Sequence, residues 1–334
     1  MRPEELLHPT PEGLYCPPGD FFIDPVRPVA RALITHGHSD HARPGHDAVL
    51  ATQPTLDIMT IRCGEDFCQR RQATSFGEPI AINGVTVTFH PAGHVLGSAQ
   101  IAVEHNGLRI VVSGDYKRRP DPTAETFEPV ACDVFITEAT FGLPVFRHPD
   151  PKAEIGRLLD SVRAVPDRTH LVGVYALGKA QRVARLLRDC GHNGPVYVHG
   201  ALTQLNELYQ ANGIELGDLR PVADNASGDF AGAIVLGPPT AFQTPWVRRF
   251  NDPLIAFASG WMQIRARMKQ FGVELPLVIS DHCDWDELTQ TIRDTGAGEI
   301  WVTHGREEAL VRWCELNAIP ARPLHLVGYE DEAE

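Results

Sequence analysis

Residues 35–41 read THGHSDH, and this stretch decides how the rest of the chain is interpreted. It carries four side chains that can bind a metal ion: His36, His38, Asp40 and His41. Gly37 permits a tight loop, in which the first two can face one ion while the last two face another. Neutral imidazole and carboxylate groups suit Zn²⁺, with Mn²⁺ and iron as alternatives. The pattern therefore predicts a metal centre and disfavours a plain polar loop.

Two further residues have the chemistry that a two-metal site needs. His94 lies in the segment 92–98 (AGHVLGS) and supplies another imidazole. Asp115 follows a strand-like run and Gly114, and its two oxygens can each reach one ion. A bridging carboxylate suits metals about 3.5–4 Å apart. Either residue alone reads as an ordinary turn residue, but with the histidine stretch upstream we expect both to be ligands.

Apolar strand-like runs end at ligand-type residues in five places. These runs are 31–35 before His36, 108–113 before Asp115, 134–137 before Glu138, 275–280 before His282 and 299–303 before His304. Side chains at strand ends are held rigidly, as a preorganised site requires. The sequence therefore predicts that these residues meet at one edge of the fold.

The middle of the chain has a different pattern, in which strands alternate with amphipathic helices. Helical spacing covers 152–165, 178–190 and 202–210, and strands are expected at 170–175, 195–199, 234–236 and 254–258. Such alternation predicts a parallel sheet. Helices are expected again at 285–295 and 307–317.

Composition limits the class of protein. The chain has 334 residues, of which 43% are apolar and 22% charged, as in globular proteins. It has no run of 18 apolar residues and no apolar signal-peptide core near its start, so we expect a cytoplasmic protein without a membrane partner. The seven cysteines are scattered and form no C-x-x-C pair, which argues against disulfides and a thiolate zinc site.

The net charge of −13 is unusual for a protein that binds nucleic acid, because phosphate-binding faces are normally basic. Two divalent cations would add about four positive charges at the site itself. The charge therefore predicts weak non-specific affinity for nucleic acid that falls quickly as salt is added.

The H-x-H-x-D-H signature, followed by His94 and Asp115, resembles the metallo-β-lactamase superfamily. The resemblance implies an α/β fold, the αββα sandwich, and two divalent metal ions, Zn²⁺ first and Mn²⁺ second. Asp24 matches the family's early aspartate, which holds the histidine loop through hydrogen bonds. The implied ligand sets are His36, His38 and His94 for one metal, Asp40, His41 and His304 for the other, and Asp115 between them.

Later motifs resemble the β-CASP branch of that superfamily, whose members are nucleases. They are Glu138 in TEATFG, His282 in SDH, His304 in VTHG and 175–181 (YALGKAQ). The resemblance runs from about residue 20 to 315. It implies a metallo-β-lactamase domain in two parts, 1–145 and 259–334, with a β-CASP α/β cap at 146–258. The segment 113–122 (SGDYKRRPDP) resembles bacterial ligase-associated DNA exonucleases, relatives of the Artemis-type enzymes.

Two positions depart from the pattern of the DNA-cleaving members. His304 is typical of RNA-cleaving members, since Artemis-like enzymes often have valine there. Asp281 replaces the usual alanine before His282 and leaves the imidazole in place.

The ligand types imply a mechanism in which a water between two metals loses a proton near neutral pH and attacks phosphorus. We expect His282 to act as general acid, oriented and kept protonated by Glu138. Asp115 and Asp40 complete the expected catalytic set. We expect substrate contacts from basic and stacking groups, with a solvated surface or a core role as the alternative: Lys117, Arg118, Arg119, Lys179, Gln181 and Trp261.

The expected function is a two-metal DNA exonuclease in DNA repair, acting from 5′ ends on DNA that is single-stranded or has free ends. An ATP-dependent DNA ligase and a helicase are the expected functional partners. Three alternatives stay open: an RNase of the same family, a small-molecule hydrolase, and a non-catalytic protein that binds nucleic acid.

Overall fold

The computed structural model describes residues 1–225, 228–270 and 272–326, and the chain divides into two compact units. Unit 1 comprises Met1–Arg147 and His282–Glu334, and unit 2 comprises His148–Asp281. The second unit is therefore an insertion in the first.

The first sheet of unit 1 contains the strand that leads into the histidine stretch. Its strands lie in chain order: β1 (His8–Thr10), β2 (Gly13–Cys16), β3 (Phe21–Ile23), β4 (Arg31–Leu33), β5 (His46–Thr52) and β6 (Cys68–Thr74). β1, β2 and β3 pair antiparallel, whereas β3 to β6 run parallel. Residues 35–41 therefore leave the sheet from the carboxyl end of a strand that has neighbours on both sides.

The second sheet of unit 1 brings three further strand ends together, those of β10, β11 and β18. Its order is β19 (Ala321–Pro323), β18 (Glu299–Gly305), β11 (Val134–Ala139), β10 (Leu108–Val112), β9 (Ala99–His105), β8 (Val85–Pro91) and β7 (Pro79–Ile82). The neighbours β10, β11 and β18 are parallel, so they end at the same edge. Asp115 lies just after the end of β10, whereas Glu138 and His304 are the next-to-last residues of β11 and β18.

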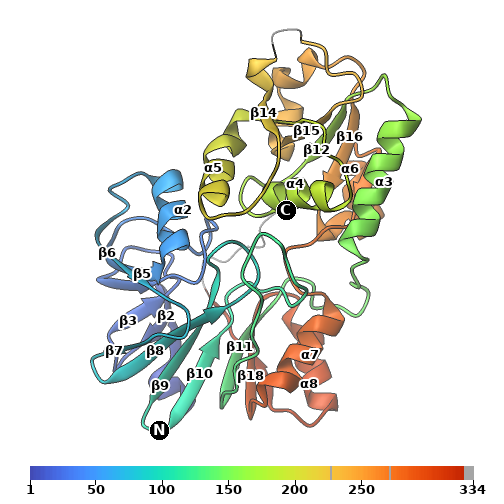
Figure 1. The fold of residues 1–334 in the computed structure, drawn as a ribbon. Coiled ribbons are helices and arrows are strands. Elements are labelled where there is room, and N and C mark those ends of the chain that lie inside the picture. Colours follow the sequence, from blue (N-terminus) through green and yellow to red (C-terminus); the bar gives the residue numbers. More distant parts are fainter. Residues whose placement is uncertain (226–227, 271, 327–334) are drawn as a thin grey trace. The chain divides into compact units, whose positions relative to one another are not determined.

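Helices cover the outer face of each sheet (Figure 1). They are α2 (Gln53–Cys63) on the first sheet and α7 (Trp285–Thr295) and α8 (Glu307–Leu316) on the second, and a short α1 (Pro3–Leu6) precedes β1. The core between the two sheets contains side chains from both of them, such as Leu50 from the first sheet and Phe89 from the second. Leu56 of α2 joins a second core, and Leu288 and Leu310 join a third. Burying each such side chain contributes roughly 1.5–3 kcal/mol. The layer order is α–β–β–α.

Unit 2 is built on a parallel sheet, as the alternating pattern predicted. Its order is β14 (Leu219–Pro221), β13 (Val196–Val198), β15 (Ile234–Gly237), β12 (His170–Gly173), β16 (Leu254–Ala258) and β17 (Leu275–Leu277), and these neighbouring strands pair in parallel. Its helices are α3 (Pro151–Ala164), α4 (Lys179–Asp189), α5 (Thr203–Ala211) and α6 (Arg265–Gln270).

The expected fold class is confirmed, and one boundary differs from the sequence analysis. The αββα sandwich with an inserted α/β unit is present. The insertion ends at Asp281 rather than at 258, because β17 pairs with β16 and extends the sheet of unit 2. In the part of the chain that the structure describes, none of the helices is long and apolar enough to cross a membrane.

Candidate metal centre

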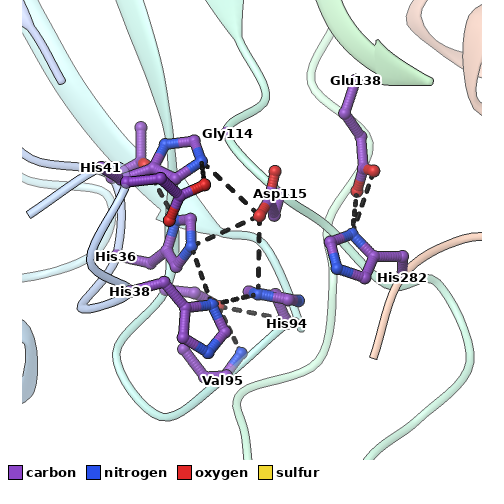
Figure 2. A network of polar contacts seen from close by, with 12 residues as sticks. His36, His38, His41, His94, Val95, Gly114, Asp115, Glu138 and His282 are labelled. Atoms are coloured by element: carbon purple, nitrogen blue, oxygen red, sulfur yellow. Dashed lines mark hydrogen bonds and ion pairs between the residues drawn. The ribbon is translucent and has the colours of Figure 1, made fainter. Parts of the chain in front are cut away.

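The histidine stretch turns its side chains toward a single point beside Asp115 (Figure 2). His36 and His41 are buried, and His38 is partly buried. The loop folds back on itself, since Ala42 donates a backbone hydrogen bond to His38 at 2.8 Å.

The first group of ligand-type atoms is compact. His38 Nδ1 lies 3.1 Å from His36 Nε2 and 2.9 Å from His94 Nε2. Asp115 Oδ2 lies 3.4 Å from His36 Nε2 and 3.8 Å from His94 Nε2. Ligand atoms around one tetrahedral Zn²⁺, each about 2.0–2.1 Å from the ion, are separated by roughly 3.3 Å. These four residues therefore have the spacing that one ion requires.

A second group combines Asp40, His41 and His304. His41 Nε2 lies 3.3 Å from Asp40 Oδ2, and the rings of His41 and His304 stack with centroids 5.2 Å apart. Asp40 Oδ1 is buried without a hydrogen-bond partner among the described residues. Because an unsatisfied buried carboxylate oxygen costs free energy, this atom fits a position that a cation would complete.

Asp115 joins the two groups. Its Oδ2 lies 3.6 Å from His41 Nε2 as well as close to the imidazoles of the first group. Gly114 places it there with φ of 55°, and a Cβ at Gly114 would lie 2.8 Å from the Cβ of Thr35. The close approach of the two sheets at this point therefore requires glycine. Burial raises the pKa of the Asp115 carboxyl group, so an isolated anion is disfavoured there.

Asp24 holds the histidine loop from behind. Its Oδ1 accepts a hydrogen bond from Thr35 N at 2.8 Å, and its Oδ2 accepts one from the Thr35 hydroxyl at 2.6 Å. His41 Nδ1 lies 2.7 Å from Oδ2, which directs His41 Nε2 toward Asp40 and Asp115. This is the arrangement by which carboxylates orient metal-binding imidazoles.

Electrostatics in the pocket favour neutral imidazole at two positions. Burial, together with repulsion from neighbouring histidines, lowers the pKa of His36 well below its ordinary value. Burial also lowers the pKa of His304 to about 3. Burial acts in the same direction on His41, but Asp40 and Asp115 outweigh it and raise its pKa well above the usual value. Since imidazole must be neutral to bind a metal, a cation in this site would compete with the proton on His41.

Glu138 and His282 form a buried pair beside the ligand groups. His282 Nδ1 lies 3.0 Å from both carboxylate oxygens of Glu138. Burial would raise the pKa of Glu138, but the charge of His282 and hydrogen bonds from Thr140 and Tyr116 outweigh it and lower the pKa. An ionised carboxylate therefore holds the Nδ1 proton of His282 and leaves Nε2 as the other reactive nitrogen of the ring.

Two of the expected substrate contacts form ion pairs at α7. Arg118 bonds to Asp294 at 2.6 Å and Arg119 to Asp284 at 2.8 Å. Lys117, just before them, is buried. Arg118 and Arg119 thus anchor their loop within unit 1, because Asp294 of α7 and its N-cap residue Asp284 supply carboxylates that the sequence pattern did not reveal.

The expected contacts in unit 2 are mostly internal. Lys179 is fully buried, and its Nζ lies 2.9 Å from both Ile279 O and Asp281 Oδ1. Gln181 is also buried and donates to Asn206 at 2.7 Å. Both side chains therefore bond within unit 2. Trp261 is half-buried with the guanidinium of Arg267 5.0 Å from its ring centroid, so its stacking role remains a prediction.

Sequence reasoning missed residues that hold the ligands in place. The Thr35 hydroxyl lies between Asp24 and His36 Nδ1, at 3.1 Å from the latter. Tyr116 donates its backbone N–H to Glu138 and accepts a backbone hydrogen bond from Cys283, next to His282. The sequence offered one signal for these residues: Thr35 directly precedes His36, and Tyr116 directly follows Asp115.

The chain is similar in sequence to several characterised proteins. It is 27% identical over 318 residues to a "Probable DNA ligase" of Opitutus terrae, covering 90% of this chain and 30% of that protein. It is 36% identical over 220 residues to "Endoribonuclease ysh-1" of Neurospora crassa, covering 54% of this chain and 25% of that protein. It is 28% identical to "Cleavage and polyadenylation specificity factor subunit 3" of Dictyostelium discoideum, covering 59% of this chain and 31% of that protein. The chain thus spans less than a third of these relatives.

The fold also has a counterpart among solved structures. A protein of unknown function from Enterococcus faecalis superposes with a TM-score of 0.59 at 12% identity, covering 90% of this chain and 80% of that one. No known family model matches the chain.

Two sheets between helical layers, with histidines and aspartates gathered at the strand ends, define a protein of the metallo-β-lactamase fold. Unit 2 is inserted between Arg147 and His282. The similarities in sequence are consistent with the resemblance to the β-CASP branch of the metallo-β-lactamase superfamily.

Proposed function

We propose that the chain is a metal-dependent nuclease that hydrolyses phosphodiester bonds in DNA. The observation that carries the proposal is the shared carboxylate: Asp115 lies within 3.8 Å of imidazoles from both ligand groups, and the buried Glu138–His282 pair lies beside them. Paired ligand groups with one bridging carboxylate are typical of sites that cleave phosphate esters.

The proposed ligands are His36, His38 and His94 for one cation and Asp40, His41 and His304 for the other, with Asp115 shared. Zn²⁺ suits this mixture of imidazole and carboxylate, and Mn²⁺ is the alternative. When bound, such ions lower the pKa of water and neutralise charge on the phosphate.

The chain's own contribution to bond cleavage is a positioned proton. Glu138 holds Nδ1 of His282, so the proton for the leaving oxygen comes from Nε2. Asp24 and Thr35 keep the histidine loop in register with Asp115. Both arrangements are rigid because their side chains are buried.

The DNA exonuclease assignment is supported by similarity to the relative named "Probable DNA ligase". The similarity covers most of this chain but less than a third of that protein, so the relative joins a similar segment to a larger chain. We infer that the present chain acts in the cytoplasm with a DNA ligase in repair and removes nucleotides stepwise, with a preference for 5′ ends. A helicase is a further proposed partner.

An RNase of the same family is the second candidate. His304 is present, and several relatives are named endoribonucleases. The two candidates share the metal chemistry and differ in the sugar of the substrate.

One assay decides between them. End-labelled single-stranded DNA and RNA of the same sequence, and a circular single-stranded DNA, are incubated with the protein and Zn²⁺, Mn²⁺ or Mg²⁺. Early release of labelled mononucleotides from linear DNA with an intact circle supports the exonuclease. Cleavage of the circle overturns the exonuclease assignment, and a strong preference for RNA overturns the DNA assignment. Asp115→Asn serves as the control for a contaminating nuclease.

A further inference from the structure

A cavity of about 470 Å³ opens in unit 1 where β4, β5 and β6 of the first sheet face β7 of the second. The inter-sheet core is incomplete here, because the outer strand β6 is exposed over most of its length. The volume lies within the roughly 300–1,000 Å³ of small-molecule sites.

Two arginines border this cavity from the same rung of the sheet. Arg31 of β4 pairs in register with Ala48 of β5, and Ala48 pairs with Arg70 of β6. Side chains on one rung point to the same face, and strands lie about 4.8 Å apart, so the two arginine Cα atoms are separated by roughly 10 Å. The small side chain of Ala48 between them leaves the space open for an anion.

The positive charge of these two arginines is not compensated within the described chain. Neither guanidinium forms an ion pair or a hydrogen bond with a described residue, and the cavity lining contains no carboxylate. The next residue, Arg71, differs: it pairs with Glu65 and lies over the ring of Phe67. In a chain with 43 acidic and 30 basic residues, an uncompensated pair of arginines in one cavity is distinctive. Guanidinium groups bind phosphate with paired hydrogen bonds.

The floor of the cavity is apolar. Ile82 of β7 belongs to the inter-sheet core, and Ile80 packs against that core from the cavity side. Leu50 lines the opposite sheet, with Gln72 beside it in register on β6. The amide of Gln72 can both donate and accept hydrogen bonds. The lining therefore suits a ligand with a phosphate at one end and a flat, partly apolar group at the other.

The cavity is separate from the metal centre. None of its lining residues belongs to the ligand groups. Arg31 begins β4, whereas His36 follows its end, and five residues of extended chain span roughly 16 Å. We propose that this cavity is a second binding site, which takes a nucleoside monophosphate through Arg31 and Arg70 and does not take part in hydrolysis.

The experiment measures binding of deoxyadenosine monophosphate, deoxyadenosine and inorganic phosphate to the full chain by calorimetry. The variants are Arg31→Gln/Arg70→Gln and Ala48→Glu, which places a carboxylate between the two arginines. Arg248→Gln, an exposed arginine of unit 2, is the matched control. We expect both cavity variants to lose one binding equivalent, or about tenfold in affinity, while the control binds as the wild type does.

Other outcomes overturn the proposal. Wild-type binding in the Arg31→Gln/Arg70→Gln variant would show that the arginines hold no anion. Equal affinity for the monophosphate and for deoxyadenosine, or for the monophosphate and inorganic phosphate, would remove the nucleotide from the proposal. Nuclease activity is measured in parallel and is expected to be unchanged in every variant, so the metal centre and this cavity are judged separately.

Discussion

The two units each bury a cluster of charged and ionisable side chains, and the clusters are built on opposite principles. In unit 2, Lys179 and Arg182 lie at 2.9 and 3.7 Å from Asp281, and the carbonyls of Ile279 and Ser280 accept further hydrogen bonds. We term these three charged residues the lysine cluster. In unit 1, imidazoles and carboxylates converge on one another instead. A cluster of opposite charges fixes the chain, whereas converging ligand-type groups are suited to be completed by a cation from outside.

The largest effect is expected from removing Asp115, the proposed shared ligand of unit 1. Asp115→Ala should reduce bound metal from about two ions per chain to less than one and lower nuclease activity at least about 10⁴-fold, or about 5.5 kcal/mol. Elemental analysis and single-turnover kinetics measure the two losses. A fully active variant with normal metal content would show that Asp115 is not a ligand.

Mutation can separate the proposed general acid, His282, from the proposed metal ligands. His282→Ala should lower the rate about 10²–10⁴-fold and leave metal content near that of the wild type, because the residue moves a proton and does not hold an ion. Glu138→Gln is the companion variant and should have a smaller effect, since the imidazole remains. Loss of metal from His282→Ala would instead make His282 a ligand, which its place near Asp115 and Glu138 allows.

The lysine cluster should respond in stability rather than in metal content. Asp281→Ala leaves the fully buried ammonium of Lys179 without its carboxylate, which costs about 3–5 kcal/mol. Thermal and urea unfolding measure the change. Lys179→Met/Asp281→Leu removes both charges and should recover most of the loss. If the double variant is no more stable than Asp281→Ala, charge pairing is not the reason for the cluster.

Asp24 lies one step behind the ligands and should have a smaller effect than any of them. Asp24→Asn keeps the shape but weakens the bonds to Thr35 and His41, so metal affinity should fall about 10–100-fold. Competition with a chromogenic chelator gives the affinity. Unchanged affinity would show that the histidine loop is rigid without this carboxylate.

The smallest effect is expected at Arg118. Its pair with Asp294 is partly exposed, so Arg118→Gln should destabilise unit 1 by no more than about 1 kcal/mol and leave KM for DNA within about twofold. Asp294→Asn is the matched variant, and the double variant should be no less stable than either single one. A tenfold rise in KM at unchanged stability would restore Arg118 as a substrate contact.

Local patterns identified the ligand-type residues that the structure brings together, because most of them lie at or shortly after the end of a strand. The sequence placed α7 at 285–295, where Asp284 and Glu287 form reciprocal capping hydrogen bonds and Gly296 ends the helix in a left-handed conformation. The parallel sheet of unit 2 was likewise predicted from the alternation of strands and helices along the sequence.

Features that depend on contacts between segments far apart in the chain could not be predicted from local sequence patterns. β6 carries polar side chains over most of its length, since it is an outer strand, and was not recognised. α2 was missed because its apolar residues do not form a single stripe, although Thr52 caps its start. The burial of Lys179 and the end of unit 2 at Asp281 both depend on β17, which joins a sheet begun far earlier in the chain.

The backbone at the end of β18 sets a limit on how this protein can be stabilised. His304 adopts φ of 55°, a left-handed conformation that costs a non-glycine residue free energy, and the pairing with β11 shifts register between Thr137 and Ala139. Selection for heat resistance alone would favour glycine or asparagine at position 304. Directed evolution of a more robust enzyme would therefore have to be screened for turnover at every round, because one available gain in stability lies at a residue proposed to serve the chemistry.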